Sequence, residues 1–183
     1  MSPEECAAYA EIASLCTVQG DIVECGVYNG DSLAAIAGVL PGRDVWAYDS
    51  FQGFPAGNPS YDDAVALGLE GAVVGSPAEV ARALDGLYDH LHIREGWFED
   101  TLEQGQPKPG SIAFLSVDCD LYESVLLVLR RLRPYVAKGG IITLDDWSCF
   151  IGCRRAYYRW AWETRQVPLL RTFGTGQAYW VNA

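Results

Sequence analysis

Short apolar runs alternate with amphipathic stretches along most of this chain. Five runs have the length and the β-branched or aromatic content of strands, and they cover residues 21–27, 44–48, 90–94, 111–117 and 141–144. Apolar residues recur at helical spacing in residues 31–39, 77–87, 122–135 and 149–164. Strands that alternate with helices predict a parallel sheet with helices on both faces.

The two ends of the chain add one helix and one hairpin to this pattern. Residues 1–18 have helical spacing, and residues 168–173 and 177–181 flank Gly174-Thr-Gly176, which is typical hairpin chemistry. We therefore predict one Rossmann-like α/β domain over residues 1–183. It comprises an N-terminal helix in residues 1–19 and a core in residues 20–183, with about seven mostly parallel strands and a C-terminal antiparallel hairpin.

Local signals set several boundaries. Ser76 is expected to cap the helix that begins at Pro77, and Asp31 or Ser32 is expected to cap the helix at 31–39. Residues 50–76 are expected to form a long loop, and loops of that length in a compact domain are usually functional or mobile. Residues 96–110 are expected to form a second loop, with room for one helical turn.

Charge and composition exclude several classes of partner. The net charge of −11 argues against nucleic acid, because phosphate binding needs clustered Lys and Arg, and it argues equally against an anionic membrane surface. No apolar stretch approaches the roughly 20 residues of a membrane span, and the acidic N-terminus lacks the basic start of a signal peptide. The six cysteines form no Cys-x-x-Cys pair, so we expect reduced thiols in a cytoplasmic protein.

Acidic residues follow three of the predicted strands. Asp49 ends one run, Asp118 and Asp120 follow another, and Asp145 and Asp146 follow a third. Because the carboxyl ends of parallel strands share one edge of a sheet, these carboxylates are expected to meet there, and a hard cation such as Mg²⁺ or Ca²⁺ would hold them together. The alternative is that they cap the helices that follow, and Asp120 in particular suits either an N-cap or a general base.

A glycine-containing turn after the first strand suggests a nucleoside cofactor. Residues Glu24-Cys-Gly26-Val-Tyr28-Asn-Gly30 lie between a strand and a helix, where the backbone admits a ligand closely. Tyr28 occupies the middle position of what would be a dinucleotide-binding glycine motif, so NAD and a P-loop are disfavoured. An acid such as Asp49, 25 positions after Glu24, commonly binds ribose hydroxyls, although the alternative is a plain tight turn.

Aromatic residues follow the third strand. Trp97 and Phe98 are suited to stack on a planar ring such as adenine, although a loop folded back on the core is the alternative. His90 and His92 alternate in a strand and share one face, and we interpret them as structural or surface residues.

Six ordered motifs carry a resemblance to a known family. They are Ile22-Val-Glu-Cys-Gly-Val-Tyr-Asn-Gly-Asp-Ser, Tyr48-Asp-Ser-Phe-Gln-Gly-Phe-Pro, Gly96-Trp-Phe-Glu-Asp-Thr-Leu, Val117-Asp-Cys-Asp-Leu-Tyr-Glu-Ser, Gly139-Gly-Ile-Ile-Thr-Leu-Asp-Asp-Trp and Gly152-Cys-Arg-Arg-Ala. Together they cover roughly residues 20–164, and the set resembles the macrocin O-methyltransferase (TylF-like) family. That family has the class I methyltransferase fold, uses S-adenosylmethionine and Mg²⁺, and mostly methylates hydroxyls of sugars in natural products.

The resemblance implies a role for each matched residue. The residues expected to bind the cofactor are Glu24, Gly26 and Ser32 near its methionine portion, Asp49, Ser50 and Phe51 near its ribose, Trp97 and Phe98 beside its adenine, and also Tyr28 and Asp118. Magnesium is expected on Asp118, Asp145 and Asp146, with Asp120 as the catalytic base. The expected partner is a small-molecule hydroxyl acceptor, and a homodimer is possible.

The chain departs from the family pattern in two ways. Only about 20 residues precede the first predicted strand, whereas family members typically carry more N-terminal structure over the active site, and position 119 is Cys where the family usually has Gly. The alternatives are a cofactor-binding module without turnover, a methyltransferase for catechol-type phenols and, less compatibly with these motifs, a nicotinamide-dependent oxidoreductase.

Overall fold

One sheet of seven strands organises the molecule. The computed structural model describes residues 1–56, 62–63, 68–102 and 110–183. The strand order is β3-β2-β1-β4-β5-β7-β6, with β1 to β5 parallel and β7 antiparallel to both of its neighbours. The strands are β1 Asp21–Cys25, β2 Val45–Asp49, β3 Leu91–Glu95, β4 Ile112–Val117, β5 Val136–Leu144, β6 Arg171–Phe173 and β7 Gln177–Val181. The predicted parallel sheet with a terminal hairpin is confirmed.

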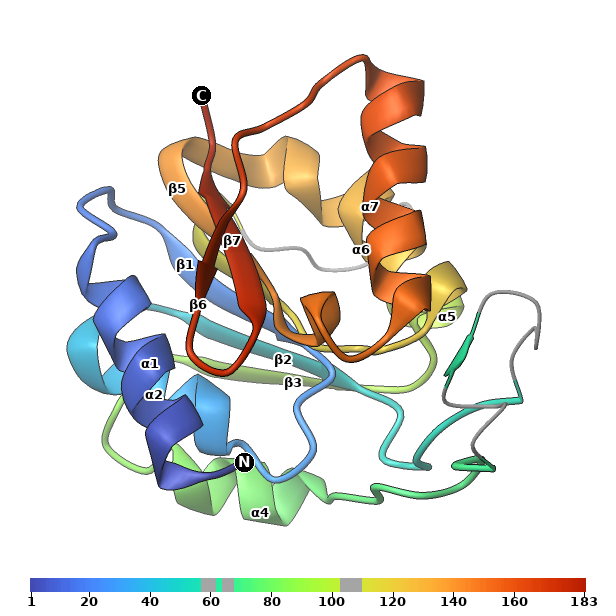
Figure 1. Cartoon of the computed structure of the whole chain (residues 1–183). Helices are drawn as coiled ribbons and strands as arrows, with labels where there is room; N and C mark the ends of the chain where they lie inside the picture. Colours follow the sequence, from blue (N-terminus) through green and yellow to red (C-terminus); the bar gives the residue numbers. More distant parts are fainter. Residues whose placement is uncertain (57–61, 64–67, 103–109) are drawn as a thin grey trace.

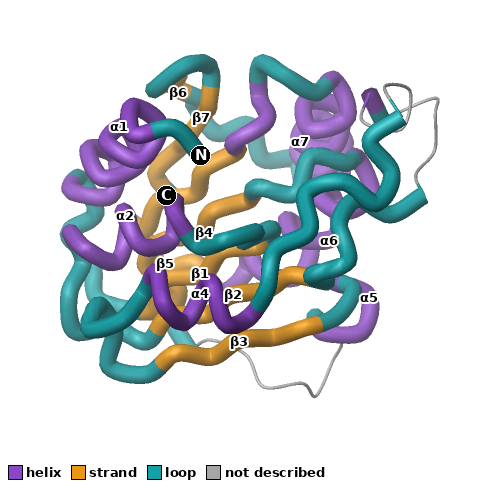
Figure 2. Tube along the Cα trace, turned by 90° about the horizontal axis from the view of Figure 1, so that it is seen from below, coloured by secondary structure: helices purple, strands orange, loops and turns teal. Residues whose placement is uncertain are grey.

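Helices cover both faces of the sheet (Figures 1 and 2). One face carries α1 Pro3–Ser14, α2 Asp31–Val39 and α4 Pro77–Ala83, and the other carries α5 Phe98–Thr101, α6 Tyr122–Leu132 and α7 Ile151–Thr164. Two short 3₁₀ helices, η1 Arg133–Tyr135 and η2 Asp145–Trp147, adjoin β5. Within the described residues, no helix is long and apolar enough to cross a membrane.

Alternation along β1 divides the core in two. Ile22 packs with the α1 and α2 side, while its neighbour Val23 packs with the α6 and α7 side, and both are fully buried. Because successive side chains of a strand point to opposite faces, a central parallel strand buried on both sides is apolar throughout. Glu24 breaks this rule, since it is a carboxylic acid with no exposed surface.

The pairing of the strands aligns their carboxyl ends side by side, and we call the four residues at these ends the strand-end row. Cys25 pairs with Tyr48 of β2 and with Val117 of β4, and Val117 pairs with Leu144 of β5. The residues that follow these four, or in β2 end the strand, are Gly26, Asp49, Asp118 and Asp145. The chemistry predicted at strand ends is therefore aligned by backbone hydrogen bonding.

Helix capping differs from expectation at two helices. Helix α2 begins after Gly30, which has a left-handed φ of 89°, and neither Asp31 nor Ser32 caps it. Asp120 does not cap α6, because the N-cap position is Leu121 and Asp120 itself has a φ of 55°. At α4 the expected cap is present, since the hydroxyl of Ser76 accepts from the amide of Glu79.

Two consecutive aspartates from the loop after β2 cap the N-termini of α6 and α7, whose own N-cap residues do not. Leu121 and Phe150, the N-cap residues of these helices, make no side-chain cap. The carboxylate of Asp62 accepts from the amide of Tyr122, and that of Asp63 accepts from the amide of Ile151. A carboxylate at a helix N-terminus satisfies an amide and favours the helix dipole, so these two residues fasten part of the loop to the α6 and α7 side.

Candidate active site

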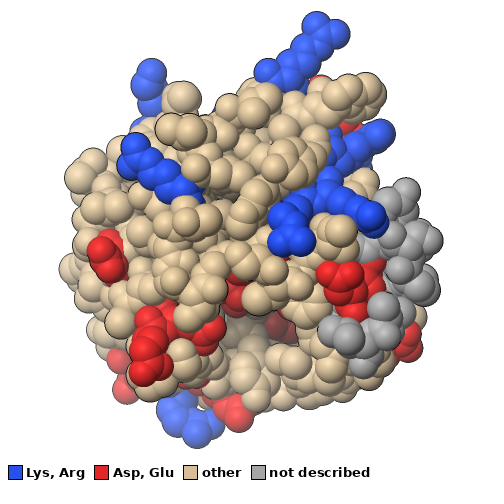
Figure 3. Space-filling view, in the orientation of Figure 1, with Lys and Arg blue, Asp and Glu red and all other residues tan. Residues whose placement is uncertain are grey.

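A cavity of about 640 Å³ opens at the carboxyl ends of the parallel strands. Its walls come from the loops after β1, β2, β3, β4 and β5, around the point where the strand order reverses between β1 and β4. Crevices at this position are where open α/β sheets bind ligands. Figure 3 shows Asp and Glu side chains around a hollow in the lower half of the displayed face, with most Lys and Arg above it.

The turn after β1 is shaped by the neighbouring loop. Gly26 has a φ of 85°, and a Cβ there would lie 1.7 Å from the carbonyl oxygen of Asp118. The sequence suggested that glycine at this position admits a ligand. In the structure it also admits the backbone after β4, so the loops that follow β1 and β4 touch beneath the cavity.

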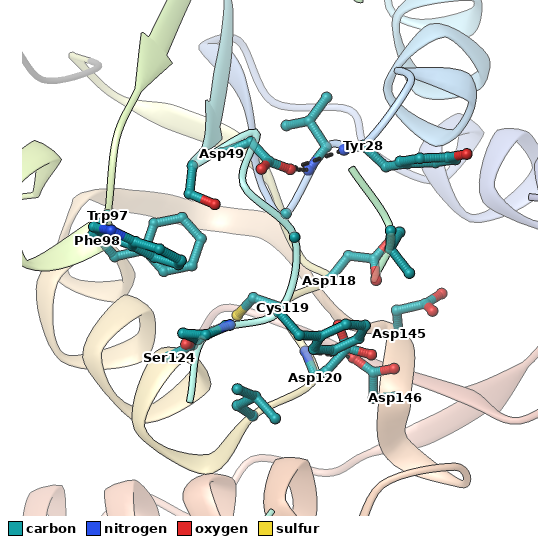
Figure 4. A pocket seen from close by; sticks show the side chains of 18 of the residues that line it. Tyr28, Asp49, Trp97, Phe98, Asp118, Cys119, Asp120, Ser124, Asp145 and Asp146 are labelled. Carbon is teal, nitrogen blue, oxygen red and sulfur yellow. Dashed lines mark hydrogen bonds between the residues drawn. The ribbon is translucent and has the colours of Figure 1, made fainter. Parts of the chain in front are cut away.

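Asp49 holds the same turn from the β2 side. Its Oδ2 accepts from the amides of Val27 at 2.7 Å and Tyr28 at 2.9 Å (Figure 4). Its Oδ1 accepts from the amide of Phe51 at 2.7 Å. These bonds support the left-handed conformations of Tyr28 and Phe51, whose φ values are 50° and 54°. Asp49 is half-buried and lines the cavity, so its role toward a ribose stays a prediction.

Two expected cofactor residues lie behind the cavity wall. Phe51 packs into the core on the α1 and α2 side, and Glu24 is fully buried in β1. The hydroxyl of Ser32, which does line the cavity, donates to Glu24 Oε2 at 3.1 Å. Burial raises the pKa of Glu24 to about 8, although the Ser116 and Ser32 hydroxyls oppose the shift.

The remaining expected cofactor residues reach the cavity directly. Ser50, Trp97 and Phe98 line it together with Gly26 and Tyr28. In Figure 4 the Trp97 and Phe98 rings lie on the opposite side of the cavity from Asp118, Asp145 and Asp146. An aromatic wall opposite a carboxylate wall suits a ligand with a planar ring at one end and polar groups at the other.

Asp118, Asp145 and Asp146 converge at the other end of the cavity. Each offers a carboxylate oxygen, and these oxygens all lie within 4.8 Å of one another. Burial, with repulsion between the carboxylates adding to it for Asp118 and Asp146, raises the pKa of all three residues. A set of crowded oxygen donors with no nearby imidazole fits Mg²⁺ or Ca²⁺, and it does not fit a metal that prefers nitrogen or sulfur.

Asp120 stands beside this cluster with its backbone fixed. Its amide donates to Asp146 Oδ2 at 2.9 Å, and its φ of 55° turns the chain sharply after Cys119. Burial raises the pKa of Asp120 to about 6. A carboxyl group with that pKa is mostly ionised at neutral pH and can accept a proton.

Two residues at the site have no counterpart among the predicted site residues. Tyr9 is predicted only as part of the N-terminal helix, yet its hydroxyl donates to Asp145 Oδ1 at 2.9 Å. Asp62 is buried and lines the cavity. No local pattern indicates either contact, because each joins segments far apart in the chain.

The two histidines, which the sequence analysis interpreted as structural or surface residues, do not line the cavity. His90 and His92 both contact Asp44, and the ring of His92 stacks on Trp46 with centroids 4.0 Å apart. All six cysteines are free.

Comparisons with known proteins agree with the geometry. A family profile described as Macrocin-O-methyltransferase (TylF) matches residues 5–180. The chain is 35% identical over 177 residues to the 8-demethyl-8-(2,3-dimethoxy-alpha-L-rhamnosyl)-tetracenomycin-C 4'-O-methyltransferase of Streptomyces olivaceus, a match that covers 89% of this chain and 66% of that protein. It is 34% identical over 175 residues to the demethyldecarbamoylnovobiocin O-methyltransferase of Streptomyces niveus, with the same coverage.

A solved structure extends the match to the backbone. The O-methyltransferase NovP superposes with a TM-score of 0.86 at 27% identity, and the match covers 98% of this chain and 80% of that one. The chain spans about two thirds of the length of the two curated relatives. The resemblance inferred from the six motifs is confirmed, and the chain belongs to the macrocin-O-methyltransferase (TylF) family.

Proposed function

We propose that this chain is an S-adenosylmethionine-dependent and Mg²⁺-dependent O-methyltransferase that acts on a hydroxyl of a sugar or another natural-product diol. The observation that carries the proposal is the row of strand ends. It gives one cavity an aromatic wall on one side and three converging aspartates on the other, in a chain of this family.

The cofactor is proposed to lie along the row from β3 to β1. Trp97 and Phe98 would flank its adenine, and Asp49 would accept from a ribose hydroxyl with the Oδ1 lone pair that the three amides leave free. Gly26 and Ser32 would contact its methionine portion. Glu24 would act from behind, since its carboxyl reaches the cavity wall through the hydroxyl of Ser32.

The cation is proposed to bind Asp118, Asp145 and Asp146. When bound, S-adenosylmethionine supplies an electrophilic methyl group, and Mg²⁺ acidifies the acceptor hydroxyl. The three carboxylates would fix the cation at the end of the cavity away from Trp97. Their crowding without a counter-charge is unfavourable, so a divalent ion also removes a repulsion built into the fold.

Asp120 is proposed to accept the proton of the acceptor hydroxyl. It lines the cavity next to the aspartate cluster, and its pKa of about 6 leaves it mostly ionised at pH 7. The cavity walls must also align the acceptor oxygen with the methyl carbon and the sulfur, because displacement at a methyl group is an in-line reaction. The strand-end row would supply that alignment.

The acceptor is proposed by analogy with the relatives. Two of them are named for a rhamnosyl-tetracenomycin and for demethyldecarbamoylnovobiocin, and both names specify O-methylation. A neighbouring pair of hydroxyls that binds one cation is common to vicinal diol sugars and catechols. The acceptor test must therefore include both classes.

Calorimetric titration with S-adenosylmethionine and S-adenosylhomocysteine, with and without Mg²⁺, tests the cofactor site. Micromolar binding of both supports the proposal, and a screen of vicinal diol sugars and catechols then tests turnover. Binding without metal-dependent turnover on any diol would favour a cofactor-binding module instead. Failure to bind either compound in either condition would refute the proposed activity.

A further inference from the structure

The N-terminal helix contributes a side chain to the aspartate cluster. Tyr9 of α1 has no exposed surface, and its hydroxyl donates to Asp145 Oδ1 at 2.9 Å. Of the three clustered aspartates, Asp145 thus has a protein hydroxyl fixed on one of its oxygens. Since α1 precedes the sheet by sequence and Asp145 follows β5, the contact joins residues 136 positions apart.

Packing, rather than the hydrogen bond, sets the position of the Tyr9 hydroxyl. The Tyr9 ring meets the ring of Phe173 edge to face with centroids 5.3 Å apart, and Phe173 in turn packs on Tyr179. Helix α1 is itself fixed at its start, where Ser2 and Glu5 form a capping box with reciprocal bonds of 3.2 and 2.8 Å. The hydroxyl is therefore held in place before any ligand arrives.

Asp145 needs such a partner more than an ordinary surface carboxylate does. Oxygens of Asp118 and Asp146 lie within 4.8 Å of an oxygen of Asp145, so the three carboxylates repel one another when all are ionised. The side chain of Gln177 is a further hydrogen-bond partner of Asp145. A donated hydrogen bond on Oδ1 stabilises the ionised form and fixes the plane of the carboxylate. Outer-shell hydrogen bonds of this kind orient metal ligands and typically change metal affinity by about 10- to 100-fold.

We propose that Tyr9 is a positioning residue that holds Asp145 in the orientation that binds the divalent cation. This inference rests on the metal site of the proposed function. It assigns to the N-terminal helix an indirect part in metal binding, beyond covering the sheet. Tyr9 acts through Asp145 and is not among the described residues that line the cavity.

The test compares two tyrosine-to-phenylalanine variants. Tyr9→Phe keeps the ring against Phe173 and removes only the hydroxyl. Tyr157→Phe is the matched control, because Tyr157 is equally buried and its hydroxyl donates to the carbonyl of Pro168 at 3.1 Å, on the α7 side of the molecule. Mg²⁺ and Mn²⁺ affinities are measured by calorimetry on the protein saturated with S-adenosylhomocysteine, which needs no turnover.

We expect Tyr9→Phe to weaken both cations by about 10- to 100-fold, with S-adenosylhomocysteine affinity in chelator unchanged, and Tyr157→Phe to match the wild type. In an Asp145→Asn background, Tyr9→Phe should cause no further loss of metal affinity. If Tyr9→Phe binds the cations as tightly as the wild type, or if Tyr157→Phe loses as much metal affinity as Tyr9→Phe, the inference about Tyr9 is wrong and the proposed metal site still stands. Absence of metal binding by the wild type would overturn the proposed metal site and this inference with it.

Discussion

Replacing Glu24 with glutamine should change how the stability of the cofactor-free protein depends on pH. The pKa of Glu24 is about 8 in the folded protein, mainly because of burial, against an ordinary value of 4.5. The folded state therefore keeps a proton that the unfolded chain releases. The stability from this proton is fully present below pH 4.5 and is lost as pH rises through 8.

The size of the effect follows from the two pKa values. Each pKa unit corresponds to about 1.4 kcal/mol, so Glu24 alone lowers the free energy of unfolding by about 3 kcal/mol between pH 5 and pH 8. That is a large part of the roughly 5–15 kcal/mol typical of a domain. Glutamine preserves the volume and the acceptor for the Ser32 hydroxyl but has no proton to release.

Urea unfolding followed by tryptophan fluorescence, in chelator at pH 5, 6, 7 and 8, measures the difference. The wild type should lose about 3 kcal/mol more than Glu24→Gln over this range, and the aspartate cluster is present in both proteins. Glu11→Gln changes an exposed glutamate and is the matched control, with a wild-type pH profile expected. Parallel profiles for Glu24→Gln and the wild type would mean that Glu24 is ionised in the folded protein, and the reasoning would fail.

Four further results are expected. Asp145→Ala should abolish turnover and leave S-adenosylhomocysteine affinity within about threefold by calorimetry; equal loss of both would indicate a structural role. Trp97→Ala should weaken the same ligand by about tenfold through lost stacking, and an unchanged affinity would remove Trp97 from the cofactor site. Asp63→Ala should destabilise the fold by about 1 kcal/mol, or about 2–4 °C in Tm by scanning calorimetry, because the amide of Ile151 loses its cap; an unchanged Tm would exclude that cap. Because the described cavity lining includes no Lys or Arg, a phosphorylated acceptor should react at least about tenfold more slowly in kcat/KM than its neutral parent, with a penalty that shrinks in salt; equal rates would contradict this.

Local patterns predicted the strand-end chemistry because strands and helices differ in period. Asp49, Asp118 and Asp145 each follow an apolar run, and parallel strands bring such ends to one edge. The pairing of Cys25 with Tyr48 and Val117, which makes the row level, depends on hydrogen bonds between strands and could not be read from the periodicity.

Long-range contacts account for what the sequence did not predict. The collision that excludes a side chain at Gly26 involves the backbone of Asp118, 92 positions later. Tyr9 carries no signal beyond a buried helical position, because its partner lies across the fold. Asp62, within a loop rich in polar residues, resembles any solvated acid until α6 is placed beside it.

The level row of strand ends has a consequence for how this scaffold tolerates change. Deleting one residue inside β4 would move the pairing of Val117 by one position, and side-chain period two would turn Asp118 from the cavity toward the opposite face. The cofactor and cation ends would be lost together. Insertions after the row, in the loops that follow Asp49 or Asp146, leave the register intact. The acceptor preference of such a protein can therefore diversify by exchange of these loops, whereas a change of one residue in the length of a strand would disrupt the site.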